Sequence, residues 1–359
     1  MRRVIFFHNN ISRIATNPED FLSRFNSYLQ VAQNSLGDAP LDLNLLLGRI
    51  HTDTRFDEIK VVRLSNSLLS QYLTLRFLLK GHGDEVTLIA GDNHLSLLIC
   101  RLAKARDTNI KLQISIHASV SALLNPTSIA EKLKLKFLLL NIKFIDSIRV
   151  VSKSDLENLK KEITNYKGQI FVAPVPIEIP NTALDRKLSN IVGMVGRLHS
   201  ERGIKECPAI FKDLKVARPE SKIMLIGDGP ERAWLESQLG GFEPKPEFTG
   251  SLTQSDIREQ WPKIHVLLSC APFESYGMAL REALVNGVFV VARKNETTEL
   301  LQAQFPTVMR VFTSTSEAAV LINGFFEQVF SPDMVLAVRQ AIKSEQDKYL
   351  TQLAKSWFV

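Results

Sequence analysis

The chain has 359 residues, of which 45% are hydrophobic, 8% aromatic and 23% charged. This composition excludes a disordered chain, and the length suits two domains. The three cysteines, Cys100, Cys207 and Cys270, have no paired spacing, which excludes a disulfide framework or a zinc knuckle and favours a reducing cytoplasm. The sequence contains no apolar run of about twenty residues, so we expect no membrane-spanning helix.

The net charge of +6 comes from the first half of the chain. Residues 1–190 contain 25 Lys and Arg against 18 Asp and Glu, whereas residues 191–359 contain 19 against 20. A basic surface attracts nucleic acid, an anionic membrane or an anionic substrate, and composition alone does not choose among them.

The first half alternates short apolar segments with helical patterns, which is typical of a parallel sheet covered by helices. One helix is predicted between Asn17 and Gly37, because Asn17 suits an N-cap, Pro18 the first helical position and Gly37 a stop. The predicted strands, whose number suits a Rossmann-like domain, are Arg3–Phe7, Leu41–Leu47, Lys60–Leu64, Val86–Ala90, Leu112–Ile116, Ile148–Ser152 and Ile170–Ala173.

A proline-containing stretch without helical or strand periodicity follows, and we interpret it as a linker. The predicted organisation is a first domain at 1–175, a linker at 176–190, a second domain at 191–330 and C-terminal helices at 331–359. In the second domain we predict strands Ile191–Val195, Lys222–Ile226, His265–Ser269 and Val288–Ala292, with helices from about Gly203, Pro230 and Tyr276. Two such α/β domains predict a cleft between them, with ligands bound by the loops that follow strands.

Three loops of the second domain carry distinctive sequences directly after predicted strands. They are GRLHSERG at 196–203, GDGPE at 227–231, and the segment from Glu274 to Ala283, which contains ESYG and REA. In this order the motifs resemble the donor-binding domain of GT-B glycosyltransferases of family 4, closely over residues 190–300. The resemblance implies an α/β fold of two Rossmann-like domains, with parallel sheets facing a central cleft, that transfers a sugar from a nucleotide diphosphate.

The motif residues suggest how a nucleotide sugar binds. A diphosphate requires cations and the N–H groups at a helix start, so Arg197 and Arg202 are candidate ligands. The alternative is that both arginines form surface ion pairs with nearby acids. By resemblance, Glu282 binds the ribose hydroxyls and Glu274 the transferred sugar. The backbone N–H groups expected to face the diphosphate are those around Ser275, Tyr276, Gly277 and Met278.

Two further residues are candidates for contact with the transferred sugar. His117 directly follows the predicted strand Leu112–Ile116, at the edge where parallel sheets bind ligands, and the resemblance places a histidine there. We expect it to orient the sugar or stabilise charge. Glu299 is a second candidate. The loop after the first strand, which begins at His8, lacks the Gly-Gly turn usual in the family, and this predicts an unusual acceptor side.

A basic helix is predicted after the capping box formed by Ser128 and Glu131. On a helical projection Lys132, Lys136 and Lys143 form one stripe, while a second stripe contains Leu133, Phe137, Leu140 and Phe144. One interpretation is a core helix with a solvated lysine edge. The other is an amphipathic helix on an anionic membrane, near a lipid-linked acceptor.

The sequence therefore predicts a retaining, metal-independent glycosyltransferase that moves a sugar from a UDP- or GDP-linked donor to a hydroxyl of a glycan or lipid-linked saccharide. No cofactor is implied, because the nucleotide sugar is a substrate. The resemblance alone implies retention and a role in bacterial surface polysaccharide or glycolipid synthesis. We expect a cytoplasmic protein, peripheral on the membrane if the basic helix binds lipid, and no nucleic-acid partner, because no reader motif is present. The alternatives are a nucleotide-sugar epimerase and a catalytically silent sugar-binding or scaffold subunit.

Overall fold

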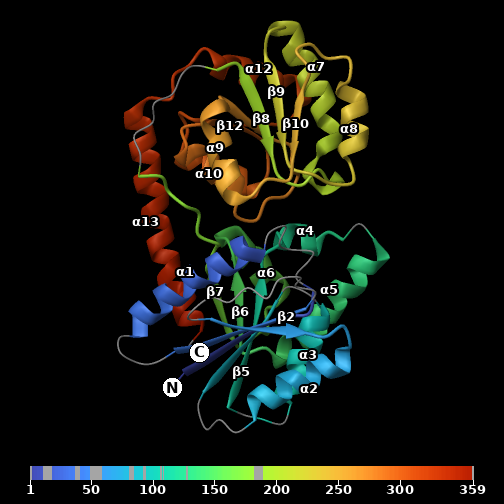
Figure 1. Cartoon of the computed structure of the whole chain (residues 1–359), viewed down its shortest axis with the longest axis vertical. Coiled ribbons are helices and arrows are strands. Elements are labelled where there is room, and N and C mark those ends of the chain that lie inside the picture. Colours follow the sequence, from blue (N-terminus) through green and yellow to red (C-terminus); the bar gives the residue numbers. More distant parts are fainter. Residues whose placement is uncertain are drawn as a thin grey trace. The chain divides into compact units, whose positions relative to one another are not determined.

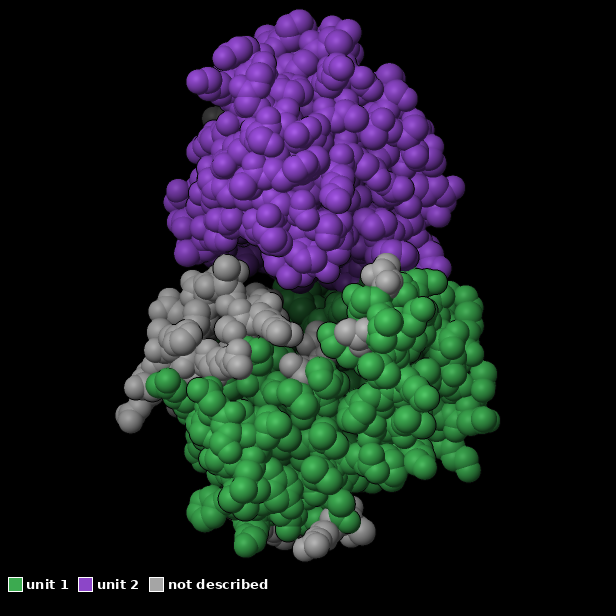
Figure 2. Space-filling view, turned by 90° about the vertical axis from the view of Figure 1, so that its right-hand side faces the viewer, with its two compact units in different colours: residues 1–176, 346–359 green, residues 177–345 purple. Residues whose placement is uncertain are grey.

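The computed structural model describes residues 2–10, 18–36, 41–48, 59–80, 85–91, 94–105, 107, 109–126, 128–181 and 189–357. The chain divides into two compact units (Figure 2). Unit 1 contains residues 1–176 and 346–359, and unit 2 contains residues 177–345. Each unit is built around its own parallel sheet, which confirms the predicted α/β fold of two Rossmann-like units (Figure 1).

Unit 1 contains a seven-stranded parallel sheet in the order β3-β2-β1-β4-β5-β6-β7. All seven strands lie where the sequence predicts them, with ends that differ by at most two residues. The strands are β1 Arg2–His8, β2 Leu41–Gly48, β3 Lys60–Leu64, β4 Val86–Ala90, β5 Ile110–Ile116, β6 Ser147–Val150 and β7 Gln169–Val172. The helices are α1 Pro18–Leu36, α2 Leu68–Leu79, α3 His94–Lys104, α4 Val120–Leu124, α5 Ile129–Asn141 and α6 Lys153–Glu162, and the 3-10 turn η2 Ile142–Phe144 follows α5.

Helices cover both faces of this sheet. One apolar cluster packs side chains of α2, α3, α5 and α6 against one face, and a second cluster packs α1 against the other. Helix α5 begins with the predicted capping box: Ser128 Oγ accepts a hydrogen bond from the Glu131 N–H at 3.2 Å, and the Glu131 carboxylate accepts one from the Ser128 N–H at 3.2 Å. The predicted cap Asn17 and stop Gly37 of α1 lie outside the described residues.

The last residues of the chain complete unit 1. A single helix, α13 Pro332–Ser356, stands where the sequence predicts C-terminal helices, and residues 346–359 belong to unit 1 instead of forming a separate segment. Trp357 is buried in the same cluster as α1. Thr87 Oγ1 on β4 donates a hydrogen bond to the Trp357 carbonyl at 2.7 Å, and Gln113 Nε2 on β5 donates one to the Ser356 carbonyl at 2.6 Å.

Unit 2 contains a six-stranded parallel sheet in the order β10-β9-β8-β11-β12-β13. The predicted strands are present, and the short edge strands β10 and β13 are additional. The strands are β8 Ile191–Val195, β9 Lys222–Ile226, β10 Glu247–Gly250, β11 Val266–Ser269, β12 Phe289–Arg293 and β13 Met309–Phe312. The helices before α13 are α7 Cys207–Ala217, α8 Arg232–Leu239, α9 Gln254–Gln260, α10 Met278–Val285, α11 Glu296–Gln304 and α12 Thr315–Phe326.

The strand order of each sheet reverses at one point. In unit 1 the chain winds outward from β1 to β3 and then continues on the other side of β1 with β4; in unit 2 the same reversal lies between β8 and β11. Open parallel sheets bind ligands outside the carboxyl ends of the strands at such a reversal. Over the described residues, no helix is both long and apolar enough to cross a membrane.

Candidate donor-binding site

The three motif loops of unit 2 lie at the carboxyl ends of adjacent strands. Gly196 follows β8, Gly227 follows β9, and the loop that contains Glu274 follows β11, so all three reach the reversal point of the sheet. A Cβ on Gly227 would lie 2.0 Å from the Gly196 carbonyl oxygen, and the φ angle of Gly227 is +136°. Both observations require glycine, because the two loops approach each other through their backbones.

Arg202 and Glu274 form an ion pair that joins the first loop to the third. Arg202 Nη1 donates to Glu274 Oε1 at 2.8 Å, and the Glu274 side chain is only 14% exposed. Burial raises the pKa of the Glu274 carboxyl, while the charges of Arg202 and Arg281 oppose this change. A partly buried carboxylate next to a half-exposed guanidinium provides a hydrogen-bond acceptor and a cation at the same point of the sheet edge.

Arg197 has a different environment. Its guanidinium contacts Glu201 four residues later, and both side chains are at least half exposed. This pair fits the alternative that Arg197 is a surface arginine balanced by a neighbouring acid. An exposed i,i+4 pair contributes little to stability, so the same guanidinium is readily available to an anionic ligand.

The loop after β11 leads into the N-terminus of α10. Gly277 is the N-cap, and its φ angle of +70° lies in the left-handed region that favours glycine. Helix α10 begins at Met278, and the Arg281 N–H makes the first helical hydrogen bond, to the Gly277 carbonyl at 3.0 Å. The N–H groups of Met278 and the next two residues precede that bond, so they point out of the helix start, where an anion is stabilised.

Thr297, which the sequence analysis does not single out, holds this loop in place. The side chain is buried at the start of α11, and its hydroxyl lies 2.8 Å from the Glu274 carbonyl and 3.0 Å from the Ser275 carbonyl. Asn295, the N-cap of the same helix, donates to the Ala271 carbonyl at 3.2 Å. These contacts fix the backbone on both sides of Phe273, so the position of the Glu274 carboxyl depends on α11.

Arg281 supports the loop from below. Its side chain is only 7% exposed; Nη1 donates to the Tyr276 carbonyl, and Cζ lies 3.7 Å from the centre of the Tyr276 ring. Nη2 donates to Glu345 Oε1 on α13 at 3.1 Å. In the sequence Arg281 is part of the REA motif, but nothing in that motif signals its burial, because the partner Glu345 lies 64 positions later.

Glu282, the predicted ribose ligand, lies in the first turns of α10. Gln254 Nε2 of α9 donates to Glu282 Oε1 at 3.1 Å, which brings a side-chain amide to the predicted ribose position. Glu299 forms an ion pair with Lys294 at 3.0 Å, and both side chains are about half exposed. Neither observation tests the predicted sugar contacts, which stay predictions.

Two cysteines that are 63 positions apart in the sequence meet beneath these loops. Cys207 Sγ and Cys270 Sγ are 3.7 Å apart, and both side chains are buried. Gly203, with a φ angle of +66°, packs directly on this pair, because a Cβ there would lie 2.0 Å from the Cys270 carbonyl oxygen. The absence of paired spacing in the sequence therefore does not exclude contact between thiols in the fold.

In unit 1 the predicted residue His117 is the first residue after β5 and is partly exposed. His8, the last residue of β1, is buried, and a Cβ on Gly91 would lie 2.2 Å from the His8 ring. The Asn9 N–H donates to Ser96 Oγ at 3.0 Å. His117 thus stands at the carboxyl edge of its own sheet, as predicted; its role toward a sugar stays a prediction.

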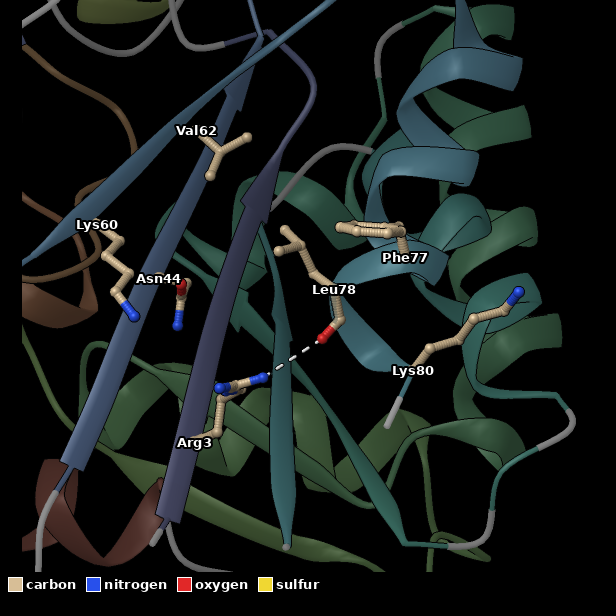
Figure 3. A pocket seen from close by; sticks show the side chains of 7 residues that line it. All are labelled: Arg3, Asn44, Lys60, Val62, Phe77, Leu78 and Lys80. Carbon is tan, nitrogen blue, oxygen red and sulfur yellow. Dashed lines mark hydrogen bonds between the residues drawn. The ribbon is translucent and has the colours of Figure 1, made fainter. Parts of the chain in front are cut away.

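A hollow of about 440 Å³ lies elsewhere in unit 1 (Figure 3). It is lined by strand residues such as Arg3, Asn44 and Lys60 and by the end of α2, where the Leu78 carbonyl accepts from Arg3 Nη1 at 3.4 Å. Arg3 and Lys60 begin their strands or lie next to the beginning, so this hollow is at the amino ends of the strands, opposite the edge that contains His117. Arg3 is already paired with Asp42 at 2.6 Å.

No group of three or more His, Cys, Asp or Glu side chains in the described parts of the chain is arranged to hold a metal ion.

The motif loops lie in a part of the chain that is similar to known proteins. Residues 178–301 match the family model of glycosyl transferases group 1. A GDP-mannose-dependent alpha-mannosyltransferase of Corynebacterium glutamicum is 33% identical over 98 residues, which are 27% of this chain and 22% of that protein. A 2-deoxystreptamine glucosyltransferase of Streptomyces kanamyceticus is 23% identical over 221 residues, which are 56% of this chain and 57% of that protein. The matched region thus covers less than a quarter of the mannosyltransferase and little more than half of the glucosyltransferase.

Solved structures resemble almost the whole chain. Sucrose-phosphate synthase from Thermosynechococcus elongatus has a TM-score of 0.76 at 14% identity, and 99% of this chain and 98% of that chain are covered. Anabaena HepE, solved in complex with UDP-glucose, has a TM-score of 0.71 at 16% identity with the same coverage. At this identity the likeness of the solved structures shows the fold alone, and the similarity to the family model is confined to residues 178–301. The chain accordingly has the GT-B fold, and residues 178–301 of its second unit resemble glycosyl transferases group 1.

Proposed function

We propose that this protein is a glycosyltransferase that uses a nucleotide-diphosphate sugar, with UDP or GDP as the nucleotide, as its donor. The observation that carries the proposal is the buried Glu274, paired with Arg202 and followed immediately by the N-terminus of α10, within a glycosyl transferases group 1 domain. A carboxylate, a cation and unsatisfied helix N–H groups at one point suit a sugar linked to a diphosphate.

Each of these groups has a place in the reaction. The diphosphate gains negative charge as its bond to the sugar breaks, and Arg202, Arg197 and the N-terminus of α10 stabilise that charge without a metal ion. Glu274 binds sugar hydroxyls, and Glu282 binds the ribose beside Gln254. The departing phosphate accepts the proton of the acceptor hydroxyl on the same face of the sugar, so the configuration at the anomeric carbon is retained.

The proposed acceptor is a hydroxyl of a glycan or a lipid-linked saccharide, in bacterial surface polysaccharide or glycolipid synthesis in the cytoplasm. A curated relative that is 23% identical over 219 residues, the phosphatidylinositol N-acetylglucosaminyltransferase gpi3 subunit of Schizosaccharomyces pombe, has a lipid acceptor in its name. His117 is the proposed unit 1 contact to the transferred sugar.

Thermal unfolding in the presence of nucleotide sugars tests the donor site. A ligand that binds only the folded protein adds about 2.7 kcal/mol of stability at 100 times its dissociation constant. One of UDP, GDP or their sugars should stabilise the wild type, and Glu282→Ala should lose this response. Glu259→Ala provides the matched control, because Glu259 is an exposed glutamate on α9 outside the site. If no nucleotide stabilises the wild type, the proposal fails.

Product analysis then separates glycosyl transfer from the other activities of such a site. Transfer to an acceptor yields free nucleotide diphosphate and a lengthened glycan with the anomeric configuration of the donor. Release of an altered sugar without any acceptor would identify an epimerase. Nucleotide-sugar binding without turnover over a broad acceptor panel would identify a sugar-binding or scaffold subunit.

A further inference from the structure

Three helices of unit 1 form a continuous surface on one side of its sheet. Helices α2, α3 and α5 pack into the same apolar cluster, and α3 contacts both α2 and α5. They lie together on the right of unit 1 in Figure 1, the side that faces the viewer in Figure 2. We call their outward surface the α2-α3-α5 face.

The α2-α3-α5 face exposes large apolar side chains. On α2, Leu69, Leu73 and Phe77 recur every four residues, and each is more than half exposed. On α5, Ile129 and Leu133 are 78% and 63% exposed. Leu68 on α2, Leu102 on α3 and Leu140 on α5 are also exposed. Scattered exposed leucines are ordinary, but aligned stripes on neighbouring helices indicate a surface that contacts something apolar.

This result separates the two interpretations of the basic helix. A core helix with a lysine edge would bury the whole predicted stripe. The structure exposes Leu133, Leu140 and Phe144, whereas Phe137, the fourth member, is partly buried and packs against the apolar cluster of unit 1. Helix α5 instead buries Leu138 and Asn141 on its other side. Most of the apolar stripe and the lysines therefore face outward together.

The charge of the same face is almost entirely positive. The segments 68–80, 94–104 and 129–144 contain eight Lys and Arg and one acid, Glu131, which caps its own helix. One of the eight, Lys104, is partly buried and forms an ion pair with Asp146. Throughout the described structure, no ion pair involves Lys132, Lys134, Lys136 or Lys143. Their ammonium groups have no carboxylate partner among the residues that the structure describes, so the face is complementary to an anionic surface.

A groove on α5 combines both properties. It has a volume of about 330 Å³, and its apolar lining includes Leu135, Leu139 and Leu140. Lys132 and Lys136, one helical turn apart, line the same groove. An apolar floor beside two ammonium groups suits a molecule with a hydrocarbon part and an anionic head.

The adjacent helix α6 shows that the pattern is local. It packs on the same side of the sheet, yet it exposes no large apolar side chain. Its exposed lysines, Lys153, Lys160 and Lys161, alternate with the acids Glu157 and Glu162. A basic residue on this side of unit 1 is therefore not by itself part of the α2-α3-α5 face.

We propose that the α2-α3-α5 face binds an anionic lipid bilayer, with the apolar side chains of α2 and α5 in the headgroup boundary and the lysines against lipid phosphates. A nucleic acid would use the lysines but leave the exposed leucines and Phe77 in water. The combination of a broad apolar surface with positive charge is the pattern of helices that lie in a membrane interface. The inference goes beyond the proposed activity, because it concerns unit 1 and does not require a donor site.

Vesicle sedimentation without nucleotide tests the charge requirement. The full-length protein should sediment with vesicles of phosphatidylcholine and phosphatidylglycerol at low salt, should not sediment with phosphatidylcholine alone, and should dissociate as salt rises. Each lysine near an anionic surface contributes about fivefold to partitioning, so the triple variant Lys132→Gln, Lys136→Gln and Lys143→Gln should bind about 100-fold more weakly. The matched control replaces Lys153, Lys160 and Lys161 of α6 with Gln and should bind like the wild type.

A second pair of variants tests whether apolar side chains enter the bilayer. Leu133→Ser combined with Leu140→Ser should weaken binding even at low salt, and both residues are exposed enough for the fold to tolerate the change, which circular dichroism checks. A tryptophan placed by Leu133→Trp should be quenched by lipids brominated on the acyl chain.

Several results would overturn the proposal. One is that the wild type does not sediment with anionic vesicles. Another is that the α6 control loses as much binding as the triple variant at Lys132, Lys136 and Lys143. Binding that ignores both leucines, with an unquenched tryptophan at position 133, would mean that the face attracts an acidic macromolecule and not a bilayer. Because the assay contains no nucleotide sugar, each of these failures is distinct from failure of the proposed glycosyl transfer.

Discussion

Arg281→Met removes the buried cation beneath the loop that contains Glu274, and it should destabilise unit 2 strongly. The side chain is 7% exposed and contacts the Tyr276 carbonyl, the Tyr276 ring and Glu345, whose own side chain is only 21% exposed. Methionine fills much of the volume but leaves the Glu345 carboxylate without its cation. Removing one partner of a buried pair costs about 3–5 kcal/mol.

Calorimetry of the full chain measures this effect. For a unit of this size, a loss of about 3–5 kcal/mol in the free energy of unfolding lowers the midpoint of thermal unfolding by roughly 6–20 °C. Hydrogen exchange of peptides from residues 274–286 locates the loss, which should be largest at the start of α10. The double variant Arg281→Met with Glu345→Gln should recover at least about 1 kcal/mol relative to the sum of the single variants, because the two side chains interact directly.

The control is Arg258→Met, which removes the exposed partner of Glu178. An exposed pair contributes at most about 1 kcal/mol, so this change should barely move the midpoint. The reasoning is refuted if Arg281→Met costs no more than Arg258→Met, or if the Glu345 variant shows no coupling to it.

Three further variants test separate features. Burial raises the pKa of Glu274, so the folded chain binds the proton of this carboxyl more tightly than the unfolded chain does. The protonated carboxyl therefore contributes stability at pH values below its usual pKa of 4.5, and this contribution is lost as the pH rises through its pKa in the folded chain. Glu274→Gln should remove this dependence and gain stability relative to the wild type as pH rises above 4.5, and parallel denaturation curves at all pH values would contradict it. Gly203→Ala should cost at least about 2 kcal/mol in urea denaturation, because the left-handed backbone and the Cys270 carbonyl both oppose a Cβ, whereas Gly241→Ala, with nothing within 4 Å, should be nearly neutral. Trp357→Ala should destabilise unit 1 by about 3–5 kcal/mol in calorimetry, and an unchanged transition would show that the C-terminal segment is not part of its core.

Local patterns predicted most of the regular structure. The strand Lys60–Leu64 and the helix from Pro18 are found with the predicted starts, because apolar runs, prolines and caps act over a few residues. Strands Glu247–Gly250 and Met309–Phe312 were missed, since four residues at a sheet edge are too few to show a period. Helix α10 begins at Met278, two residues after the predicted Tyr276, because Gly277 takes a left-handed conformation that only the fold requires.

The candidate site was predicted to the extent that it consists of contiguous motifs. Glu274 and Arg202 belong to motif loops, and the structure joins them in an ion pair. Thr297 and Arg281, in contrast, hold the loop that contains Glu274 through contacts between different elements. The spacing of residues in the sequence does not indicate such contacts. The exposure of Leu133 is likewise not predictable from a helical projection. The projection shows that the helix has two stripes, but it does not show which side of the helix packs against the sheet.

The position of the last residues constrains how the protein is made. During translation, residues 1–176 leave the ribosome long before Ser356 and Trp357, yet the side chains of Gln113 and Thr87 in the middle of their sheet donate to the carbonyls of those two residues. Unit 2 is contiguous and can fold as soon as it emerges, whereas unit 1 must wait with an open apolar face. In the nascent chain the apolar surface that Trp357 covers is therefore left open until synthesis reaches the end of α13.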